Sequence, residues 1–381
     1  MKVILHISAD YPDAIVPNKT NAVRALLESQ TSHRHLVYSL NRTDGLRKIE
    51  GLPFGGDHVA VTYEAPPRGI LHHTRLKALA RWIGDDLDRR NIRPDLLHCH
   101  KLTVEGLIGL ELKARFGCPM IVSVQGDTDT KILDTRIDLR PVFRVVALQS
   151  AALISVSAWP LAHLRKTLGG AIDKCLVLPA ISQVNSFSTA MLAGTPRLAS
   201  TFHLLSWRRK GADTLARAAS IAAKDYPGLV IDIYGGGPPD KVLALEQTLR
   251  ALDPKGHVRL AGPIEPENLV STLGTYAGYV MPSRRETYGM AYVEALFSGL
   301  PLVHARGRGV DGMIPAQVGY ACDPFDVKAV AEGMVRLLAN EATLKAAVSQ
   351  AQADGSLTYL TAAHIAATYG SLLEKTLTSG R

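Results

Sequence analysis

Short apolar runs alternate with stretches of helical periodicity along the whole of this 381-residue chain. Apolar runs of four to eight residues between turn residues are typical of buried strands, whereas apolar positions three and four apart indicate amphipathic helices. Regular alternation of the two predicts βα units and parallel sheets. The chain is also too long for one ordinary core, so we predict an α/β protein of two Rossmann-like, doubly wound domains.

The first half supplies one set of these elements. Strands are predicted at Val3–Ile7, His35–Ser39, Val59–Tyr63, Leu96–Cys99, Met120–Val124, Leu153–Val156 and Cys175–Leu178. Helices are predicted at Asn21–Ser29, Leu71–Arg89, Thr103–Phe116 and Leu139–Ser150.

The second half repeats the alternation. Strands are predicted at Arg197–Leu204, Leu229–Tyr234, Val258–Ala261, Tyr279–Met281, Leu302–His304 and Gly319–Cys322. Helices are predicted at Gly211–Asp225, Asp240–Ala251, Pro266–Tyr276, Met290–Ser298, Val327–Leu338 and Ala342–Ala353.

A stretch rich in Ser, Thr, Asn and Gly separates the two sets. Residues 181–196 lack clear periodicity and are predicted to be a linker. We therefore expect an N-terminal domain over residues 1–185, a C-terminal domain over 186–357 and a final helix within 358–381. Ligands of open α/β sheets bind outside the carboxyl ends of the strands, so two such sheets are expected to face a common cleft.

Composition is that of a globular protein, with 46% hydrophobic and 20% charged residues. No apolar run reaches the ~18 residues of a membrane span, and the N-terminal strand lacks the features of a signal peptide. The four cysteines are scattered without C-x-x-C spacing, which favours neither a disulfide framework nor a zinc site. We expect a cytoplasmic protein, either soluble or peripheral at the inner face of a membrane.

The net charge of +8 is unevenly distributed, because residues 1–190 hold 24 Lys and Arg against 18 Asp and Glu. A basic first half favours an anionic partner, such as membrane phospholipid, a lipid-linked diphosphate or nucleic acid. No nucleic-acid-binding motif is present, so nucleic acid is not expected. Residues 71–82 combine an apolar stripe with basic flanks, which fits either a membrane surface or packing against the domain's own sheet.

Residues 282–296 hold two glutamates, Glu286 and Glu294, around a predicted loop-to-helix junction. Because Met290–Phe297 is otherwise uncharged, Glu294 is expected to be at least half-buried, and a buried charge needs a partner. Sugar hydroxyls would supply donors to both carboxylates, and the amides that open the helix form an anion site beside them. This combination suggests a nucleotide-sugar pocket, whereas either glutamate alone is also explained by helix capping.

The run from Pro282 to Val303 resembles the signature of retaining glycosyltransferases of GT-B fold, family 4 (glycosyl transferases group 1), whose pattern "PS..E..G...(L/V)EA...G.P(L/V)" carries the E-x7-E pair. The resemblance implies that the C-terminal domain binds a UDP- or GDP-linked sugar and the N-terminal domain binds the acceptor. It also implies retention of configuration, no metal or other cofactor, and a last helix that crosses back onto the N-terminal domain.

The resemblance further implies a donor site on several loops. Lys210 matches the family lysine that contacts the donor diphosphate, and His203 stands where the family has arginine, so that Arg208 or Arg209 is expected to compensate. The turn with Gly236 and the loop with Pro263 and Ile264 match segments that hold the nucleobase. The remaining expected donor contacts are Ser283, Glu286 for the hexose, Thr287, Tyr288, Gly289, Met290, and Glu294 for the ribose.

The first domain departs further from the family pattern. A loop containing Asn18 replaces the usual Gly-Gly turn, and we expect Lys19 to contact the donor phosphates instead. His98 and His100 resemble the family's "H.H". As a metal pair they lack an evident third ligand, so we expect core or acceptor-loop histidines, with His100 on the acceptor side.

Gln125 replaces the histidine of the family's "HG.D" motif, so Asp127 or Asp129 is left to orient or deprotonate the acceptor hydroxyl. Loop capping by these aspartates is the alternative.

Together these features predict a hexosyltransferase, with Glu286, Lys210 and Asp127 as its catalytic residues and a lipid-linked cell-surface glycan as its acceptor. The altered first-domain loops leave a second hypothesis open, that of a non-catalytic subunit that binds a nucleotide sugar. A GT-B epimerase or phosphorylase is a third, weaker alternative.

Overall fold

The computed structural model describes residues 1–182 and 184–379. The part of the predicted linker at residue 183 and the end of the predicted last segment, residues 380–381, therefore lie outside the described residues. The chain forms two compact units, one of residues 1–181 and 363–381 and the other of residues 182–362.

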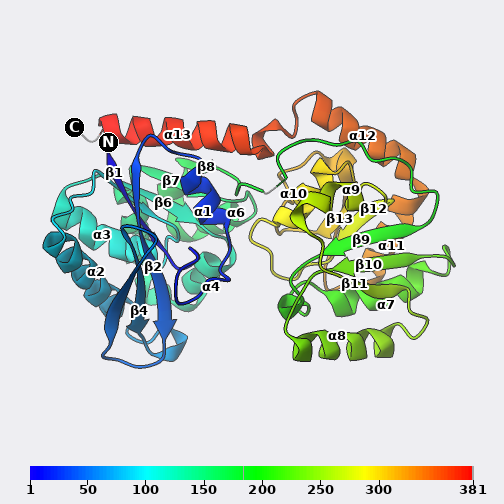
Figure 1. The fold of residues 1–381 in the computed structure, drawn as a ribbon, viewed down its shortest axis with the longest axis horizontal. Coiled ribbons are helices and arrows are strands. Elements are labelled where there is room, and N and C mark those ends of the chain that lie inside the picture. The colour runs from blue at the N-terminus through cyan, green and yellow to red at the C-terminus, as the bar shows by residue number, and fades with distance from the viewer. Residues whose placement is uncertain (183, 380–381) are drawn as a thin grey trace. The chain divides into compact units, whose positions relative to one another are not determined.

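The first unit contains an eight-stranded sheet in the order β3-β4-β2-β1-β5-β6-β7-β8 (Figure 1). Its strands are β1 (Val3–Ser8), β2 (Arg34–Thr43), β3 (Ile49–Phe54), β4 (His58–Glu64), β5 (Leu96–Cys99), β6 (Met120–Val124), β7 (Ala152–Ser155) and β8 (Cys175–Val177). Its helices are α1 (Ala22–Glu28), α2 (His72–Arg89), α3 (Glu105–Phe116), α4 (Asp127–Thr135), α5 (Arg140–Gln149), α6 (Pro160–Leu168) and α13 (Ala362–Ser379), with 3-10 turns η1 (Pro67–Gly69), η2 (Ile137–Leu139) and η3 (Gly169–Ile172).

The second unit contains a six-stranded, all-parallel sheet in the order β11-β10-β9-β12-β13-β14. Its strands are β9 (Arg197–Thr201), β10 (Val230–Tyr234), β11 (Val258–Gly262), β12 (Gly278–Met281), β13 (Leu302–Ala305) and β14 (Gly319–Cys322). Its helices are α7 (Ala212–Ala222), α8 (Pro239–Leu252), α9 (Leu269–Leu273), α10 (Met290–Phe297), α11 (Val327–Ala339) and α12 (Glu341–Ala353), with 3-10 turns η4 (Leu204–Ser206), η5 (Pro266–Asn268), η6 (Ala316–Val318) and η7 (Thr358–Leu360). Helices α7 and α8 lie on one face, and α9 and α10 on the other (Figure 1).

Both sheets confirm the predicted doubly wound α/β fold. In chain order, the second sheet reads 3-2-1-4-5-6, which is the Rossmann order, and its order reverses between β9 and β12. The first sheet has the same reversal between β1 and β5. One strand was not predicted: β3 pairs antiparallel with β4 at the edge of the first sheet. Ligand sites are expected at the carboxyl ends of the strands beside each reversal.

The apolar stripe of α2 packs inside the first unit. Leu76, Leu79, Ala80 and Ile83 are fully buried in the core against the sheet. Of the two interpretations that residues 71–82 allowed, packing against the domain's own sheet is therefore correct for the stripe. None of the helices in the described residues is both long and apolar enough to cross a membrane.

Helix α13 packs on the first unit although it comes last in the sequence. Its Ile365, Tyr369 and Leu373 are buried with Ile4 of β1 and Leu96 of β5 in one apolar cluster. The helix therefore packs against the central strands of the first sheet.

Candidate functional site

The loops after β9 and β12 meet at the reversal of the second sheet. Gly211 has φ +74°, and a Cβ atom there would lie 2.1 Å from the carbonyl oxygen of Pro282. A side chain at this position is excluded both by the backbone conformation and by the space. The backbone N–H of Arg284 donates to the carbonyl of Arg209 at 2.8 Å, which joins the two loops. The sequence thus holds Lys210 beside the loop that carries Glu286.

Lys210 and Glu286 form an ion pair at this junction. Nζ of Lys210 lies 2.5 Å from Oε2 of Glu286, and only 12% and 11% of the two side chains are exposed. A Cβ atom at Gly309, where φ is +58°, would lie 3.1 Å from Cγ of Glu286. The side-chain stem of Glu286 is therefore packed closely against the backbone of Gly309. The two predicted catalytic residues of the second domain are brought together.

Glu294 lies in α10, half-buried, and its carboxylate accepts a hydrogen bond from within the same unit. The Ser182 hydroxyl donates to Oε1 at 3.1 Å. Burial raises the pKa of Glu294, and the Ser182 hydrogen bond offsets this only in part. A carboxylate in this state gains from every further donor that approaches it.

Tyr288 is a buried polar group beside this helix. Its hydroxyl has no hydrogen-bond partner within residues 1–182 and 184–379, and only 3% of the residue is exposed. Burial also raises the pKa of this phenol well above its usual value. Tyr288 thus offers an unused hydrogen-bond donor close to the predicted donor site.

The other predicted donor residues lie on loops at the carboxyl ends of β9 to β12. Some of their backbone groups already form hydrogen bonds within the protein. The Gly236 carbonyl, for example, accepts from Leu204 N–H at 2.9 Å. His203 Nδ1 accepts from Leu205 N–H at 3.3 Å, and both His203 and Arg208 are exposed. Ser283, in the loop after β12, is buried, and its hydroxyl donates to the Arg285 carbonyl at 3.2 Å. The remaining predicted donor residues are Pro263, Ile264, Thr287, Gly289 and Met290.

On the acceptor side, Lys19 is bonded within its own unit. Its ammonium donates to Asp13 Oδ2 at 2.7 Å, to Ser39 Oγ at 2.9 Å and to the Leu40 carbonyl at 3.2 Å. Burial opposes ionisation of Asp13, but its hydrogen bonds outweigh this and lower its pKa to about 2. All three ammonium protons are used, so a phosphate contact by Lys19 requires these bonds to be given up. Neighbouring Asn18 is exposed.

Asp129 joins two loops of the first sheet. Its Oδ1 accepts from the backbone N–H and the hydroxyl of Thr103, at 2.9 and 2.7 Å, and Oδ2 accepts from Gln125 N–H at 2.8 Å. The residue is fully buried. This geometry favours the capping interpretation for Asp129 and leaves Asp127, the partly exposed first residue of α4, as the aspartate for an acceptor hydroxyl.

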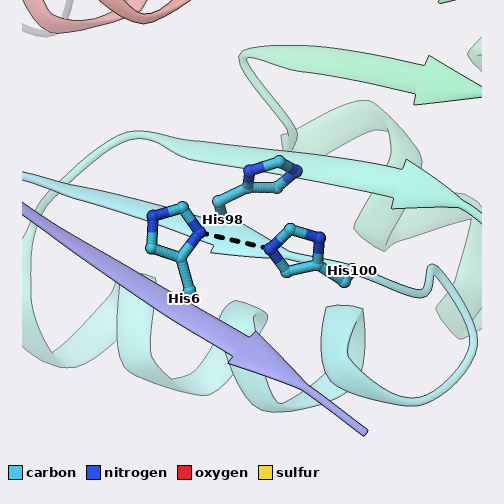
Figure 2. A group of neighbouring side chains, drawn as sticks. All are labelled: His6, His98 and His100. Atoms are coloured by element: carbon cyan, nitrogen blue, oxygen red, sulfur yellow. Dashed lines mark hydrogen bonds between the residues drawn. The ribbon is translucent and has the colours of Figure 1, made fainter. Parts of the chain in front are cut away.

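Three buried histidines lie at the reversal of the first sheet (Figure 2). His6 of β1 pairs in register with His98 of β5, and a ligand nitrogen of each lies within 4.8 Å of one on His100. The sequence offered no third histidine beside His98 and His100, and the structure shows that His6 takes this place. Aligning β1 with β5 across the predicted reversal would have found it.

Hydrogen bonds account for most of the ring nitrogens of these histidines. His35 Nε2 lies 2.7 Å from the Gln30 carbonyl, so it carries the proton, and His35 Nδ1 accepts from His6 Nε2 at 2.9 Å. His6 Nδ1 is then an acceptor for His100 Nε2–H at 3.2 Å. His35, His6 and His100 thus form a row of hydrogen-bonded rings, which we call the histidine chain. One neutral tautomer of each ring satisfies these hydrogen bonds.

His98 lies beside the histidine chain and connects α13 to the first sheet. Its Nδ1 lies 2.7 Å from the Tyr369 hydroxyl and its Nε2 lies 2.8 Å from Ser123 Oγ. Its ring stacks on that of His100 with centroids 4.0 Å apart and planes at 28°, so the nitrogen lone pairs of the two rings do not converge. A metal ion here would have to displace these hydrogen bonds. The arrangement is that of a buried polar network.

Burial keeps these imidazoles uncharged. It lowers the pKa of His6 and His98 well below the usual value and that of His100 to about 3. Repulsion by any neighbouring histidine that became protonated, and by Lys101 in the case of His100, acts in the same direction.

Comparisons with known proteins agree with this architecture. One component of human phosphatidylinositol N-acetylglucosaminyltransferase is 31% identical over 130 residues, which cover 34% of this chain and 26% of that protein. Glycogen synthase of Mycobacterium tuberculosis is 24% identical over 372 residues, covering 88% of this chain and 86% of that protein. The chain thus matches only about a quarter of the human relative but most of the bacterial one.

Solved structures share the fold over the full length. Sucrose-phosphate synthase from Thermosynechococcus elongatus has a TM-score of 0.73 at 19% identity, with 100% of both chains covered. Anabaena Alr3699/HepE in complex with UDP-glucose has a TM-score of 0.67 at 15% identity, also with 100% of both chains covered.

Two family models match consecutive parts of the chain. The glycosyl transferase 4-like domain matches residues 20–180, and glycosyl transferases group 1 matches residues 190–354. The second match contains Lys210, Glu286 and Glu294. With both halves matched and the fold shared with glycosyltransferases over its full length, the chain belongs to the glycosyl transferases group 1 family of GT-B fold.

Proposed function

We propose that this protein transfers a hexose from a nucleoside diphosphate donor to an acceptor hydroxyl. The observation that carries the proposal is the Lys210–Glu286 pair at the reversal of the second sheet, where open α/β sheets bind their ligands. The structural relative that binds UDP-glucose supports this class of donor.

Lys210 has the role of stabilising the leaving group. When the bond between the sugar and the diphosphate breaks, negative charge builds up on the diphosphate oxygens. An ammonium held at the reversal, together with exposed Arg208 and the amides that precede α10, meets this charge without a metal ion. Glu286 keeps the ammonium in place before the donor arrives.

The two glutamates have separate roles in this proposal. Glu286 accepts hydrogen bonds from the hexose hydroxyls, and Glu294 accepts them from the ribose diol, which would satisfy a carboxylate whose burial now raises its pKa. A hydrogen bond to a charged group contributes about 1.5–3 kcal/mol, so loss of either carboxylate would lower kcat/KM roughly ten- to a hundred-fold.

On the acceptor side, Asp127 at the first turn of α4 is proposed to orient the acceptor hydroxyl and take its proton. The acceptor oxygen then forms the new bond to the sugar carbon as the diphosphate leaves. Retention of configuration is proposed from family membership.

The acceptor is proposed to be a lipid-linked glycan of the cell surface. The basic excess of residues 1–190 favours an anionic acceptor or surface. The human relative, whose name specifies phosphatidylinositol, agrees with this class of acceptor.

A non-catalytic protein that binds a nucleotide sugar is the second candidate. Two observations favour it: the ammonium of Lys19 and the carboxylate of Asp129 are saturated by bonds within their own unit. Such a protein would keep the donor pocket but would lack chemistry on the acceptor side.

Release of UDP or GDP separates the two candidates. The wild-type protein is incubated with UDP- and GDP-hexoses and a bacterial lipid extract, beside Lys210→Ala and the exposed-site control Lys224→Ala. The transferase proposal predicts nucleotide release that depends on lipid, falls at least a hundred-fold in Lys210→Ala and is unchanged in the control. Tight nucleotide binding with no release would favour the non-catalytic candidate.

A further inference from the structure

Two neighbouring segments of the first unit expose large apolar side chains. Ile70 and Leu71, between η1 and α2, are 58% and 50% exposed, and Ile137 of η2 is 62% exposed. The Arg136 guanidinium donates to the carbonyl of Gly69, so the two segments lie side by side. Grouped apolar side chains on a surface mark an interaction site more often than scattered ones do.

The backbone of the first segment holds these side chains outward in an unusual conformation. Arg68 has φ +58° and Leu71 has φ +55°, and they are two of the three non-glycine residues with positive φ in the described residues. A leucine in the left-handed region is strained. Leu71 recovers little through burial, because half of it remains exposed.

The same two segments carry most of the net positive charge of the first half, although they hold seven of its 24 Lys and Arg. Residues 67–77 hold three Arg and Lys and no acid, and residues 131–144 hold four Arg and Lys and two Asp. Their combined excess of five accounts for nearly all of the excess of six in residues 1–190. Both aspartates already face cations, Asp138 with Arg136 and Asp134 with Arg140.

We propose that these segments, residues 67–77 and 131–144, form a surface that docks on an anionic lipid bilayer. Exposed apolar side chains surrounded by cations, such as Ile70, Leu71 and Ile137 here, are suited to the boundary between lipid headgroups and acyl chains. The apolar side chains would insert there, and the cations would contact the lipid phosphates. None of these three exposed side chains has an aromatic ring that could stack on bases, which disfavours a nucleic acid. The inference rests on the proposed lipid-linked acceptor, since a docked enzyme would meet that acceptor at the membrane.

Flotation with vesicles tests the surface without requiring turnover. The full chain is mixed with vesicles of phosphatidylcholine alone or with ~30% phosphatidylglycerol, a content that gives the bilayer a clearly negative surface potential. The variants are Ile70→Ser/Leu71→Ser/Ile137→Ser and Arg68→Glu/Lys131→Glu. The matched controls in the second unit are Leu243→Ser, which is 55% exposed in the wild type, and Lys255→Glu.

The wild-type protein and both controls should float with anionic vesicles only, and each test variant should bind at least about tenfold less. Binding of UDP or GDP, measured in parallel, should be equal in all of them, so that failure of docking is distinguished from loss of the donor pocket. An apolar variant that binds like the wild type would contradict the proposal, as would a wild-type protein that ignores anionic vesicles or is displaced from them by oligonucleotide.

Discussion

Lys210 and Glu286 stand 76 positions apart in the sequence, yet their charged atoms lie 2.5 Å from one another. The reversal of strand order between β9 and β12 brings their loops together, and the missing side chain of Gly211 lets the loops touch. A lysine and a glutamate from two separate motifs of the sequence thus become a pre-arranged pair at the ligand end of a sheet.

Gly211→Ala should disturb this junction. The new Cβ atom would combine a strained φ of +74° with a 2.1 Å approach to the Pro282 carbonyl, and we expect a loss of at least about 2 kcal/mol in the free energy of unfolding. The matched control is Gly256→Ala, because Gly256 has φ +73° and open space around its Cβ position. Urea unfolding that gives equal losses for both variants would show that the Pro282 contact is unimportant.

Nucleotide binding should depend on pH through Glu294. Ribose hydroxyls favour the ionised carboxylate, so the pKa of Glu294, now raised by burial, should fall on binding. The affinity for the nucleotide is then highest above the raised pKa that Glu294 has in the free protein, and it falls as the pH drops through that pKa. Calorimetry in two buffers of different ionisation enthalpy should detect proton release by the wild-type protein and none by Glu294→Gln. Equal proton release by both would assign it to another group.

The histidine chain should make the first unit sensitive to acid. Burial lowers the pKa of His6, His35, His98 and His100 in the folded state, so below pH ~6.5 the unfolded chain binds protons that the folded one does not. Stability should fall by up to about 1.4 kcal/mol per pH unit for each histidine. Glu105, whose pKa burial raises to about 7, and Asp129, whose pKa burial also raises, act in the opposite sense but are two groups against four.

Urea unfolding between pH ~7.5 and ~4.5, a range that spans the usual pKa of histidine, measures this slope. His6→Gln should reduce the slope of stability against pH by about 1.4 kcal/mol per pH unit, which corresponds to one proton, even if the variant is less stable at every pH. A stability that stays constant over this range would mean that the histidines are protonated in the folded protein.

Lys19→Ala should destabilise the first unit, because it leaves the fully buried side chain of Asp13 without its counter-ion. The expected loss is about 3 kcal/mol, against less than about 0.5 kcal/mol for the exposed control Lys166→Ala. Denaturant unfolding gives these values. A Lys19→Ala protein of normal stability that binds the nucleotide sugar more weakly would instead support the predicted phosphate contact.

The regular parts of the fold could be predicted from the sequence. Strands such as Leu96–Cys99 and Met120–Val124 are buried on both faces, and each is apolar except for one residue, so the apolar pattern predicted them. The edge strand Ile49–Phe54 was missed because it is largely exposed and contains Gly51 and Pro53, which interrupt the apolar pattern. Helix α4, directly after Gly126, was missed because it is short and polar.

The candidate site was only partly predictable. The apolar context of Glu294 indicated its burial, which the structure bears out. That Lys19 bonds to Ser39 and that His6 joins His100 depend on contacts between separate strands and loops, which local sequence does not encode. Short motifs therefore indicated which residues lie together in the second unit, Lys210 and Glu286, but not those that lie together in the first.

Calorimetric titration of the purified protein with UDP and with GDP, in EDTA, measures whether the second unit binds a nucleotide. We expect that one nucleotide binds without metal, that Glu294→Ala weakens this binding at least about tenfold and that Lys224→Ala leaves it unchanged. Binding of neither nucleotide, or equal binding by the wild-type protein and Glu294→Ala, would contradict the proposed donor pocket.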